Sequence, residues 1–294
     1  MQVVVFGKLF KEKDLPYVQG LFDAMQAEGL QVSVYTPYLE LIQDLVTFNE
    51  PVQPFDDHQA FRNRRIDFVV VLGGDGTMLQ ALLLVRNAGV PLLGINLGRM
   101  GFLASVEKIF IRDAIQKLRR GQYRIEERTT LYLESHPSLF GDMPVALNDC
   151  TLLKRDTSSM ITVHTFLNGD YLNSYWADGI ILATPTGSTG YSLSCGGPVI
   201  LPDSANFVLT PVAPHNLNVR PIVLSDESVI SFEIEGRGDN FICTLDSRFE
   251  LITAQQQLAV RKNDFTVKLV VMENITFLNT IREKLAWGAD IRNY

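Results

Sequence analysis

The sequence is poor in the residues that build disulfides and metal sites. Its 294 residues include three cysteines and four histidines. The cysteines, Cys150, Cys195 and Cys243, are odd in number and show no Cys-x-x-Cys spacing. That pattern argues against structural zinc and fits the reducing cytoplasm. With so few scattered histidines, we also expect no histidine-rich metal site.

Clusters of one charge and long apolar runs are also missing. The formal net charge is −7, and no block of like charges stands out, so we expect no nucleic-acid partner and no anionic-membrane binding. No apolar stretch approaches the roughly 20 residues that cross a bilayer. The first seven residues read as a strand rather than a signal peptide. We therefore expect a globular protein of one or two domains.

The hydrophobic pattern changes character once along the chain. Before residue 122, apolar strands alternate with helices, which predicts a doubly wound parallel sheet. The expected strands are 2–6, 31–35, 66–72 and 91–96, and the expected helices are 15–28, 38–46, 77–88 and 107–120, with a loop at 51–59. After residue 123 short strands dominate, which predicts an antiparallel β-rich domain. These strands are expected at 130–135, 145–154, 161–167, 171–177, 179–184, 228–234, 241–245 and 265–271.

The predicted fold class is therefore α/β, with two domains and a returning tail. Residues 1–122 form the N-terminal doubly wound α/β domain, and residues 123–272 form the C-terminal β-rich domain. Residues 273–294 include a helix at 277–287 that we expect to pack back on the first domain.

A glycine-rich turn at residues 73–77 follows the apolar strand 66–72 and reads Gly-Gly-Asp-Gly-Thr. Ligands of open α/β sheets bind beyond the carboxyl ends of strands. Glycines let the backbone approach a ligand closely, and the N–H groups at a helix start favour anions. Asp75 is the unusual member, because a carboxylate repels phosphate unless it accepts a proton, binds a hydroxyl or helps hold a metal. A simpler interpretation makes Asp75 only the N-cap of the following helix.

A second turn rich in glycine and hydroxyls lies in the β-rich domain. Residues 184–190 read Thr-Pro-Thr-Gly-Ser-Thr-Gly and precede a short helix from about Tyr191. Hydroxyls and helix-start N–H groups suit ribose, amide or phosphate oxygens, although a plain helix cap has the same composition. Because the two turns belong to different domains, we expect each to supply one wall of an interdomain cleft.

These two motifs carry a resemblance to a known family. The turn 73–77 resembles the signature shared by NAD kinases, diacylglycerol and sphingosine kinases and, more distantly, 6-phosphofructokinases. The second turn, continued by Tyr-Ser-Leu-Ser, resembles the NAD-binding motif of NAD kinases. Residues 96–103 (Asn-Leu-Gly-Arg-Met-Gly-Phe-Leu), the pair Asn148-Asp149 and the ending Lys-Leu-Ala-Trp at 284–287 are similar to further motifs of that family. The sequence is identified as a member of the prokaryotic-type NAD kinases over residues 66–287.

The resemblance implies transfer of the γ-phosphoryl group of ATP to the 2′-hydroxyl of the adenosine ribose of NAD, which gives NADP. It implies Mg²⁺ or another divalent metal as cofactor, although no protein residue is assigned as a metal ligand. It further implies a cytoplasmic homodimer or homotetramer whose partners are NAD and ATP. The motifs are compatible with ATP or polyphosphate as donor and with NAD or NADH as acceptor.

The resemblance also assigns roles to residues. Asp75 would be catalytic and accept the proton of the 2′-hydroxyl. Phe102 would line the adenine pocket, and Asp178 would lie beside the nicotinamide half. The implied NAD-binding residues are Asp75, Gly76, Phe102, Asn148, Asp149, Asp178, Thr189, Gly190, Tyr191, Ser192, Leu193, Ser194 and Arg248. The implied ATP-phosphate residues are Gly73, Gly74, Gly76 and Thr77, and Arg99 is either a phosphate contact or a solvated cation.

Three positions depart from the family pattern. Asp149 replaces the usual Glu, so its ribose contact is reset or water-mediated. Gly190 replaces the usual Ala and loosens the turn. Trp176 stands where many bacterial relatives carry a basic residue, which puts a contact to phosphate or nicotinamide from that position in doubt.

Two other classes of function compete with this interpretation. A redox enzyme that uses NAD without phosphorylating it is disfavoured, because no G-x-G-x-x-G follows a strand. A lipid kinase is disfavoured, because the Gly-Thr-x-Asn-Asp stretch of those enzymes and a membrane-binding helix are both missing.

Overall fold

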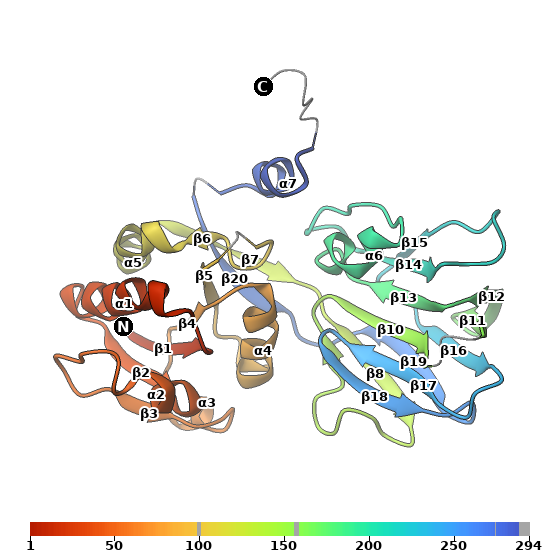
Figure 1. Cartoon of the computed structure of the whole chain (residues 1–294), viewed down its shortest axis with the longest axis horizontal. Helices are drawn as coiled ribbons and strands as arrows, with labels where there is room; N and C mark the ends of the chain where they lie inside the picture. The colour runs from red at the N-terminus through yellow and green to blue at the C-terminus, as the bar shows by residue number, and fades with distance from the viewer. Residues whose placement is uncertain (99–100, 156–158, 274, 288–294) are drawn as a thin grey trace. The chain divides into compact units, whose positions relative to one another are not determined.

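The chain folds into two compact units in the computed structural model, which describes residues 1–98, 101–155, 159–273 and 275–287. The first unit contains residues 1–127 and the chain from residue 267 onward, and the second contains residues 128–266. The chain therefore leaves the first unit once and returns to it (Figure 1). Arg99, and with it part of the motif at 96–103, lies outside the described residues.

The first unit is built on a largely parallel sheet with strand order β3-β2-β1-β4-β5-β20-β7 and β6 beside β5. In chain order these strands are β1 Gln2–Gly7, β2 Gln31–Tyr35, β3 Gln53–Phe55, β4 Phe68–Leu72, β5 Leu92–Asn96, β6 Val106–Glu107, β7 Tyr123–Arg128 and β20 Val267–Met272. Every residue of β4 and β5 is buried, as expected for strands covered on both faces.

Helices cover both faces of this sheet. The helices of this unit are α1 Leu15–Ala27, α2 Thr36–Ile42, α3 Ala60–Asn63, α4 Asp75–Val85, α5 Ile111–Arg120 and α7 Phe277–Leu285, with 3₁₀ turns η1 Glu12–Asp14 and η2 Lys108–Phe110. Apolar residues of α1 and α5 share a core with Val70 and Leu93. On the opposite face, a Cβ at Gly94 would lie 2.9 Å from the sulfur of Met78 on α4. The predicted doubly wound domain is confirmed.

The second unit consists of two antiparallel six-stranded sheets that share one apolar core. Their orders are β15-β14-β13-β10-β17-β18 and β12-β11-β16-β19-β8-β9. The strands are β8 Leu131–His136, β9 Val145–Ala146, β10 Asp149–Lys154, β11 Ile161–Leu167, β12 Asp170–Ala177, β13 Gly179–Ala183, β14 Asn206–Val212, β15 Ile222–Ser225, β16 Ile230–Glu235, β17 Phe241–Leu245, β18 Arg248–Ile252 and β19 Gln257–Lys262, with η3 Gly187–Thr189 and α6 Tyr191–Ser194. The predicted β-rich domain is confirmed.

Several elements differ from those expected. The strand predicted at 145–154 is two strands, β9 and β10, which pair in different sheets and leave Leu147 and Asn148 as the connection. The loop predicted at 51–59 contains β3. The strand expected at 265–271 is β20, which pairs with β5 in the first sheet, so the chain crosses back into the first unit at residues 266–267 rather than after residue 272.

Candidate functional site

The glycine turn joins β4 to α4 and has no room for a side chain at its first position. Gly73 has φ of 150°, and a Cβ there would lie 2.3 Å from the Thr77 hydroxyl. A Cβ at Gly74 or Gly76 would instead meet no atom within 4 Å among the described residues. The N–H groups of Asp75 and Gly76 precede the first hydrogen bonds of α4, which run from Thr77 and Met78 to the carbonyl of Gly74. The turn therefore presents backbone donors beside open space, as an anion site requires.

Asp75 uses its carboxylate to hold a neighbouring loop. Oδ2 accepts the N–H of Phe102 at 2.8 Å, and Oδ1 accepts those of Leu103 at 3.0 Å and Ala104 at 3.1 Å. A Cβ at Gly101 would lie 1.8 Å from Oδ1, so this close approach requires glycine.

The same geometry shows how much of the Asp75 carboxylate remains available. An ionised carboxylate has about four acceptor positions, and three are filled by these N–H groups. The remaining one is on Oδ2, which can accept a hydroxyl proton. The simpler interpretation of Asp75 as the N-cap is wrong, because Gly74 is the N-cap and no side chain caps α4.

In the second unit, Asp246 fixes the pair Asn148-Asp149. Its Oδ1 accepts the N–H of Asn148 at 2.7 Å and of Asp149 at 3.2 Å, and its Oδ2 accepts that of Leu147 at 2.9 Å. The N–H of Asp246 in turn donates to the carbonyl of Asp149 at 3.0 Å. Asp246 follows β17 with φ of 55°, which turns it toward the start of β10. It holds the pair in place through the backbone.

Asp149 itself is buried, with 7% of its surface exposed. Burial raises the pKa of its carboxyl from 3.8 to about 7, and the negative charge of Asp246 adds to the rise. Burial also raises the pKa of Asp246, although its backbone donors and Arg248 oppose that rise. The second unit thus carries two neighbouring carboxyl groups, and the charge of Asp246 disfavours the ionisation of Asp149.

The second glycine turn packs against this pair. The hydroxyl of Thr184 donates to the carbonyl of Leu147 at 2.6 Å, and the N–H of Thr184 donates to the carbonyl of Asn148 at 2.9 Å. A Cβ at Gly187 would lie 2.0 Å from the same carbonyl oxygen, and one at Gly190 would lie 3.9 Å from Asp149 Oδ2. The fold therefore brings Asn148, Asp149 and the 184–190 turn together. The two motifs are far apart in the sequence, so neither of them alone indicates this contact.

The residues after this turn differ in how freely they can meet a ligand. Tyr191 is 41% exposed and Ser194 is exposed. The hydroxyl of Thr189 donates to the carbonyl of Thr186 at 3.2 Å, and that of Ser192 is buried against the Thr210 hydroxyl at 2.8 Å. Thr189 and Ser192 thus have hydroxyls already engaged within the fold. The backbone of Gly190 is also engaged, because its N–H donates to the carbonyl of Gly187 at 2.8 Å and its carbonyl accepts the N–H of Ser194 at 3.4 Å.

Two further predicted contact residues are tied to neighbouring segments. Asp178 Oδ1 lies 2.6 Å from Lys154 Nζ, so Lys154 orients and partly neutralises it. Arg248 donates to the carbonyls of Met143, at 2.7 Å, and Val145. Its guanidinium thereby fixes the 143–145 segment.

Trp176, which departs from the family pattern, is half exposed and contacts His215 with ring centroids 4.2 Å apart and ring planes tilted by 38°. This ring contact covers part of the exposed indole.

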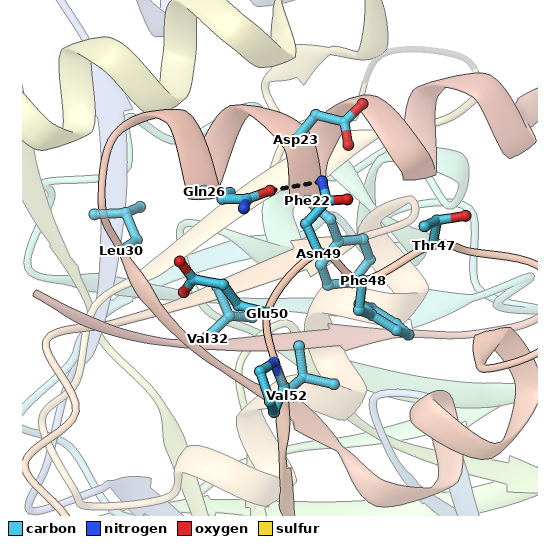
Figure 2. Close-up of a pocket in the computed structure, with 11 residues that line it drawn as sticks. Phe22, Asp23, Gln26, Leu30, Val32, Thr47, Phe48, Asn49, Glu50 and Val52 are labelled. Atoms are coloured by element: carbon cyan, nitrogen blue, oxygen red, sulfur yellow. Dashed lines mark hydrogen bonds between the residues drawn. The ribbon is translucent and has the colours of Figure 1, made fainter.

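The described residues contain no group of three His, Cys, Asp or Glu side chains that could hold a metal ion, and no helix long and apolar enough to cross a membrane. A small pocket of about 40 Å³ lies between α1 and the 47–52 segment, where the Asn49 amide donates to Gln26 (Figure 2). It contains none of the predicted site residues and is far smaller than the roughly 300 Å³ typical of ligand sites.

Comparison with known proteins decides the family. A family model described as the ATP-NAD kinase N-terminal domain matches residues 18–123, and one described as the ATP-NAD kinase C-terminal domain matches residues 147–272. The chain belongs to the NAD kinase family. The family resemblance stated from the motifs is confirmed.

Relatives and solved structures agree with this assignment. NAD kinases of Cytophaga hutchinsonii and Flavobacterium johnsoniae are 44% and 41% identical, and in each case 100% of both chains is covered. An NAD kinase from Archaeoglobus fulgidus in complex with ATP has a TM-score of 0.74 at 26% identity, covering 97% of this chain and 99% of that one. Yeast NADH kinase complexed with NADH has a TM-score of 0.86 at 24% identity, covering 100% and 90%, and shows the same fold.

Sequence reasoning missed two residues at these sites. Asp246 stands in an unremarkable Leu-Asp-Ser stretch, and its role depends on contacts with residues about a hundred positions earlier. Lys284 was noted only as part of the C-terminal motif, yet its ammonium lies 3.7 Å from Asp75. Neither contact has a local signal in the sequence.

Proposed function

We propose that this NAD kinase family member transfers the γ-phosphoryl group of ATP to the 2′-hydroxyl of the adenosine ribose of NAD, with Asp75 as the catalytic base. The observation that carries the proposal is the Asp75 carboxylate, held by three backbone N–H groups with one acceptor position left on Oδ2. A base that is already fixed accepts the hydroxyl proton without losing entropy at that step.

The reaction would proceed at the glycine turn. The ribose 2′-oxygen forms a bond to the γ-phosphorus, the bond from that phosphorus to the bridging oxygen of ADP breaks, and the hydroxyl proton passes to Asp75 Oδ2. Gly74 and Gly76 leave room for the phosphates, and the start of α4 supplies N–H groups toward their charge. Gly73 and Thr77 shape the turn.

The proposed NAD contacts are the residues that the family motifs assign. Asp75, Gly76 and Phe102 belong to the first unit. Asn148 and Asp149 would bind ribose hydroxyls, since the Asp149 carboxyl can accept two hydroxyl protons when it is ionised, with Asp246 positioning the pair. Asp178 would lie beside the nicotinamide half. The remaining proposed contacts are Thr189, Gly190, Tyr191, Ser192, Leu193, Ser194 and Arg248.

The divalent metal fits this arrangement only as a partner of the ATP phosphates. Asp75 is the one acidic residue of the glycine turn, and its carboxylate is largely occupied by backbone donors. Mg²⁺ commonly binds through substrate phosphates and its own waters rather than in an all-protein cage. When bound, it would neutralise phosphate charge.

The proposal also includes the cellular compartment and the oligomeric state of the enzyme. Its cysteines are free, which fits the cytoplasm, and the family resemblance suggests a homodimer or homotetramer. Size-exclusion chromatography with light scattering measures the assembly directly.

The activity is tested by incubating the protein with NAD, ATP and Mg²⁺ and measuring NADP. NADP formation that requires both ATP and NAD supports the proposal. In parallel incubations, reduction of NAD by an added alcohol substrate without ATP would identify a redox enzyme instead, and phosphorylation of added diacylglycerol by ATP without NADP formation would identify a lipid kinase.

A further inference from the structure

The final helix α7 contacts the loop that holds Asp75. Phe277, Ile281 and Lys284 are spaced i, i+4 and i+7, so they lie on one face of the helix. Phe277 contacts Phe102 with ring centroids 6.1 Å apart, and Lys284 Nζ lies 4.4 Å above the same ring. Ile281 is buried between these positions along the helix. Phe102 therefore anchors both ends of α7.

This contact brings an ammonium group to Asp75. Lys284 Nζ is 3.7 Å from Asp75 Oδ2, which is close enough for charge attraction and too long for a hydrogen bond. Three quarters of the Lys284 side chain is covered. An ammonium has three N–H donors, and neither the ring of Phe102 nor Asp75 at that distance accepts a short hydrogen bond from it. Among the described residues no acceptor takes a hydrogen bond from this ammonium, so its donors can meet an anion at this position.

The glycine turn needs such a cation. Residues 73–77 and 101–104 contain one carboxylate and no Lys or Arg, and Arg99 of the 96–103 motif lies outside the described residues. A γ-phosphoryl group placed within reach of Asp75 would face a negative charge, and in transfer its charge spreads over three equatorial oxygens. A fixed ammonium beside the carboxylate offsets both effects.

We propose that Lys284 is a catalytic residue whose ammonium contacts the phosphoryl group during transfer, with Phe102 holding its side chain in place. This inference rests on the proposed function, because it places the γ-phosphate at Asp75. The C-terminal helix then supplies the active-site cation that the glycine turn lacks.

The test uses the full chain with Lys284→Met, Lys284→Arg and the matched control Arg282→Met. Met keeps the length and the contact with Phe102 but removes the charge. Arg282 lies on the same helix and bonds to Leu278 and Asn279, away from Asp75. We expect Lys284→Met to lower kcat about 10²-fold with KM for NAD within about 3-fold, Lys284→Arg to recover most of that loss, and Arg282→Met to match the wild type.

A titration with Mg²⁺ and inorganic tripolyphosphate separates this inference from the proposed function. We expect Lys284→Met to weaken tripolyphosphate binding at least 5-fold and Arg282→Met to leave it unchanged. If the wild type makes no NADP, the proposed function fails, and this titration still decides the role of Lys284.

If NADP forms while Lys284→Met retains kcat within 2-fold and binds tripolyphosphate normally, the Lys284 inference is overturned alone. The inference would also be overturned if Lys284→Met and Lys284→Arg lost activity to the same extent and both had a lowered melting temperature. Lys284 would then have a structural role.

Discussion

At the scale of single residues, Asp75 combines a structural and a chemical role in one carboxylate. Its three backbone donors orient both oxygens, and the same bonds tie the start of α4 to the 101–104 loop. Asn at this position cannot reproduce the arrangement, because its amide nitrogen is a donor and would face a backbone N–H. The substitution therefore removes one of the backbone hydrogen bonds to the 101–104 loop and the carboxylate oxygen that accepts the proton.

We expect Asp75→Asn to lower kcat by about 10² or more, the usual scale for removing a general base. The lost backbone bond should cost about 1–2 kcal/mol of stability. Steady-state kinetics and thermal unfolding measure the two effects, and a calorimetric NAD titration should give an affinity within a few-fold of the wild type. Near-normal turnover would leave Asp75 with a purely structural role.

The raised pKa of Asp149 predicts how the free energy of unfolding depends on pH. Burial, with a contribution from Asp246, raises its folded-state pKa from 3.8 to about 7. Between these values the folded state holds a proton that the unfolded chain has released. The stabilising contribution is therefore full below about pH 4 and is lost as the pH rises to 7.

We expect Asp149→Asn to remove this dependence, because the amide does not titrate. Relative to the variant, the wild type should lose about 2–3 kcal/mol between pH 5 and pH 8, since each pKa unit corresponds to about 1.4 kcal/mol. Urea unfolding at the two pH values measures the difference. If the gap between wild type and variant is the same at both, Asp149 has an ordinary pKa.

At the scale of elements, the 184–190 turn is shaped by its approach to Asn148 and Asp149 rather than by its own sequence. A Cβ at Gly190 would lie 3.2 Å from the carbonyl of Gly187 and 3.9 Å from Asp149 Oδ2. A methyl group fits with a small shift, whereas the branched side chain of valine must extend further into this space. The space at position 190 therefore admits only a small side chain beside Asp149.

We expect Gly190→Ala to bind NAD within about 3-fold of the wild type and Gly190→Val to bind at least 10-fold more weakly, which is about 1.4 kcal/mol. Both should keep the melting temperature within a few degrees, because a loop change outside the core usually costs little stability. Calorimetric titration of the folded variants provides the measurement. Unchanged affinity in Gly190→Val would mean that the turn serves only as a helix cap.

Elements with strong local patterns were predictable from the sequence, and elements defined by distant partners were not. The apolar runs of β4 and β13 and the glycine turns beside them were identified. Strands β14, β15, β18 and β19 were missed. Pro211 lies within β14, a residue that argues against a strand, and β18 alternates exposed residues with partly buried ones. Asp246 and Lys284 were missed for the related reason that their partners lie far away in sequence.

At the scale of the whole molecule, the second unit is an insertion in the first. The chain enters it after residue 127 and leaves it before residue 267. Its two ends meet, because the hydroxyl of Thr130 donates to the carbonyl of Phe265 at 2.9 Å and the N–H of Asn263 donates to the carbonyl of Thr130 at 2.9 Å. It also has its own apolar core, formed by both of its sheets. These are the properties of a segment that can fold alone.

We expect residues 128–266, expressed alone, to unfold in one cooperative thermal transition, because their core and both sheets are complete. The fragment keeps Asn148, Asp149, Asp246 and the 184–190 turn but lacks Asp75 and its neighbours. Under the proposed function it should therefore bind NAD at least 10-fold more weakly than the full chain. A fragment carrying Gly190→Val provides the control for binding at the same turn. Equal affinity of fragment and full chain would contradict any contribution of the glycine turn to NAD binding and would confine the NAD contacts to the second unit.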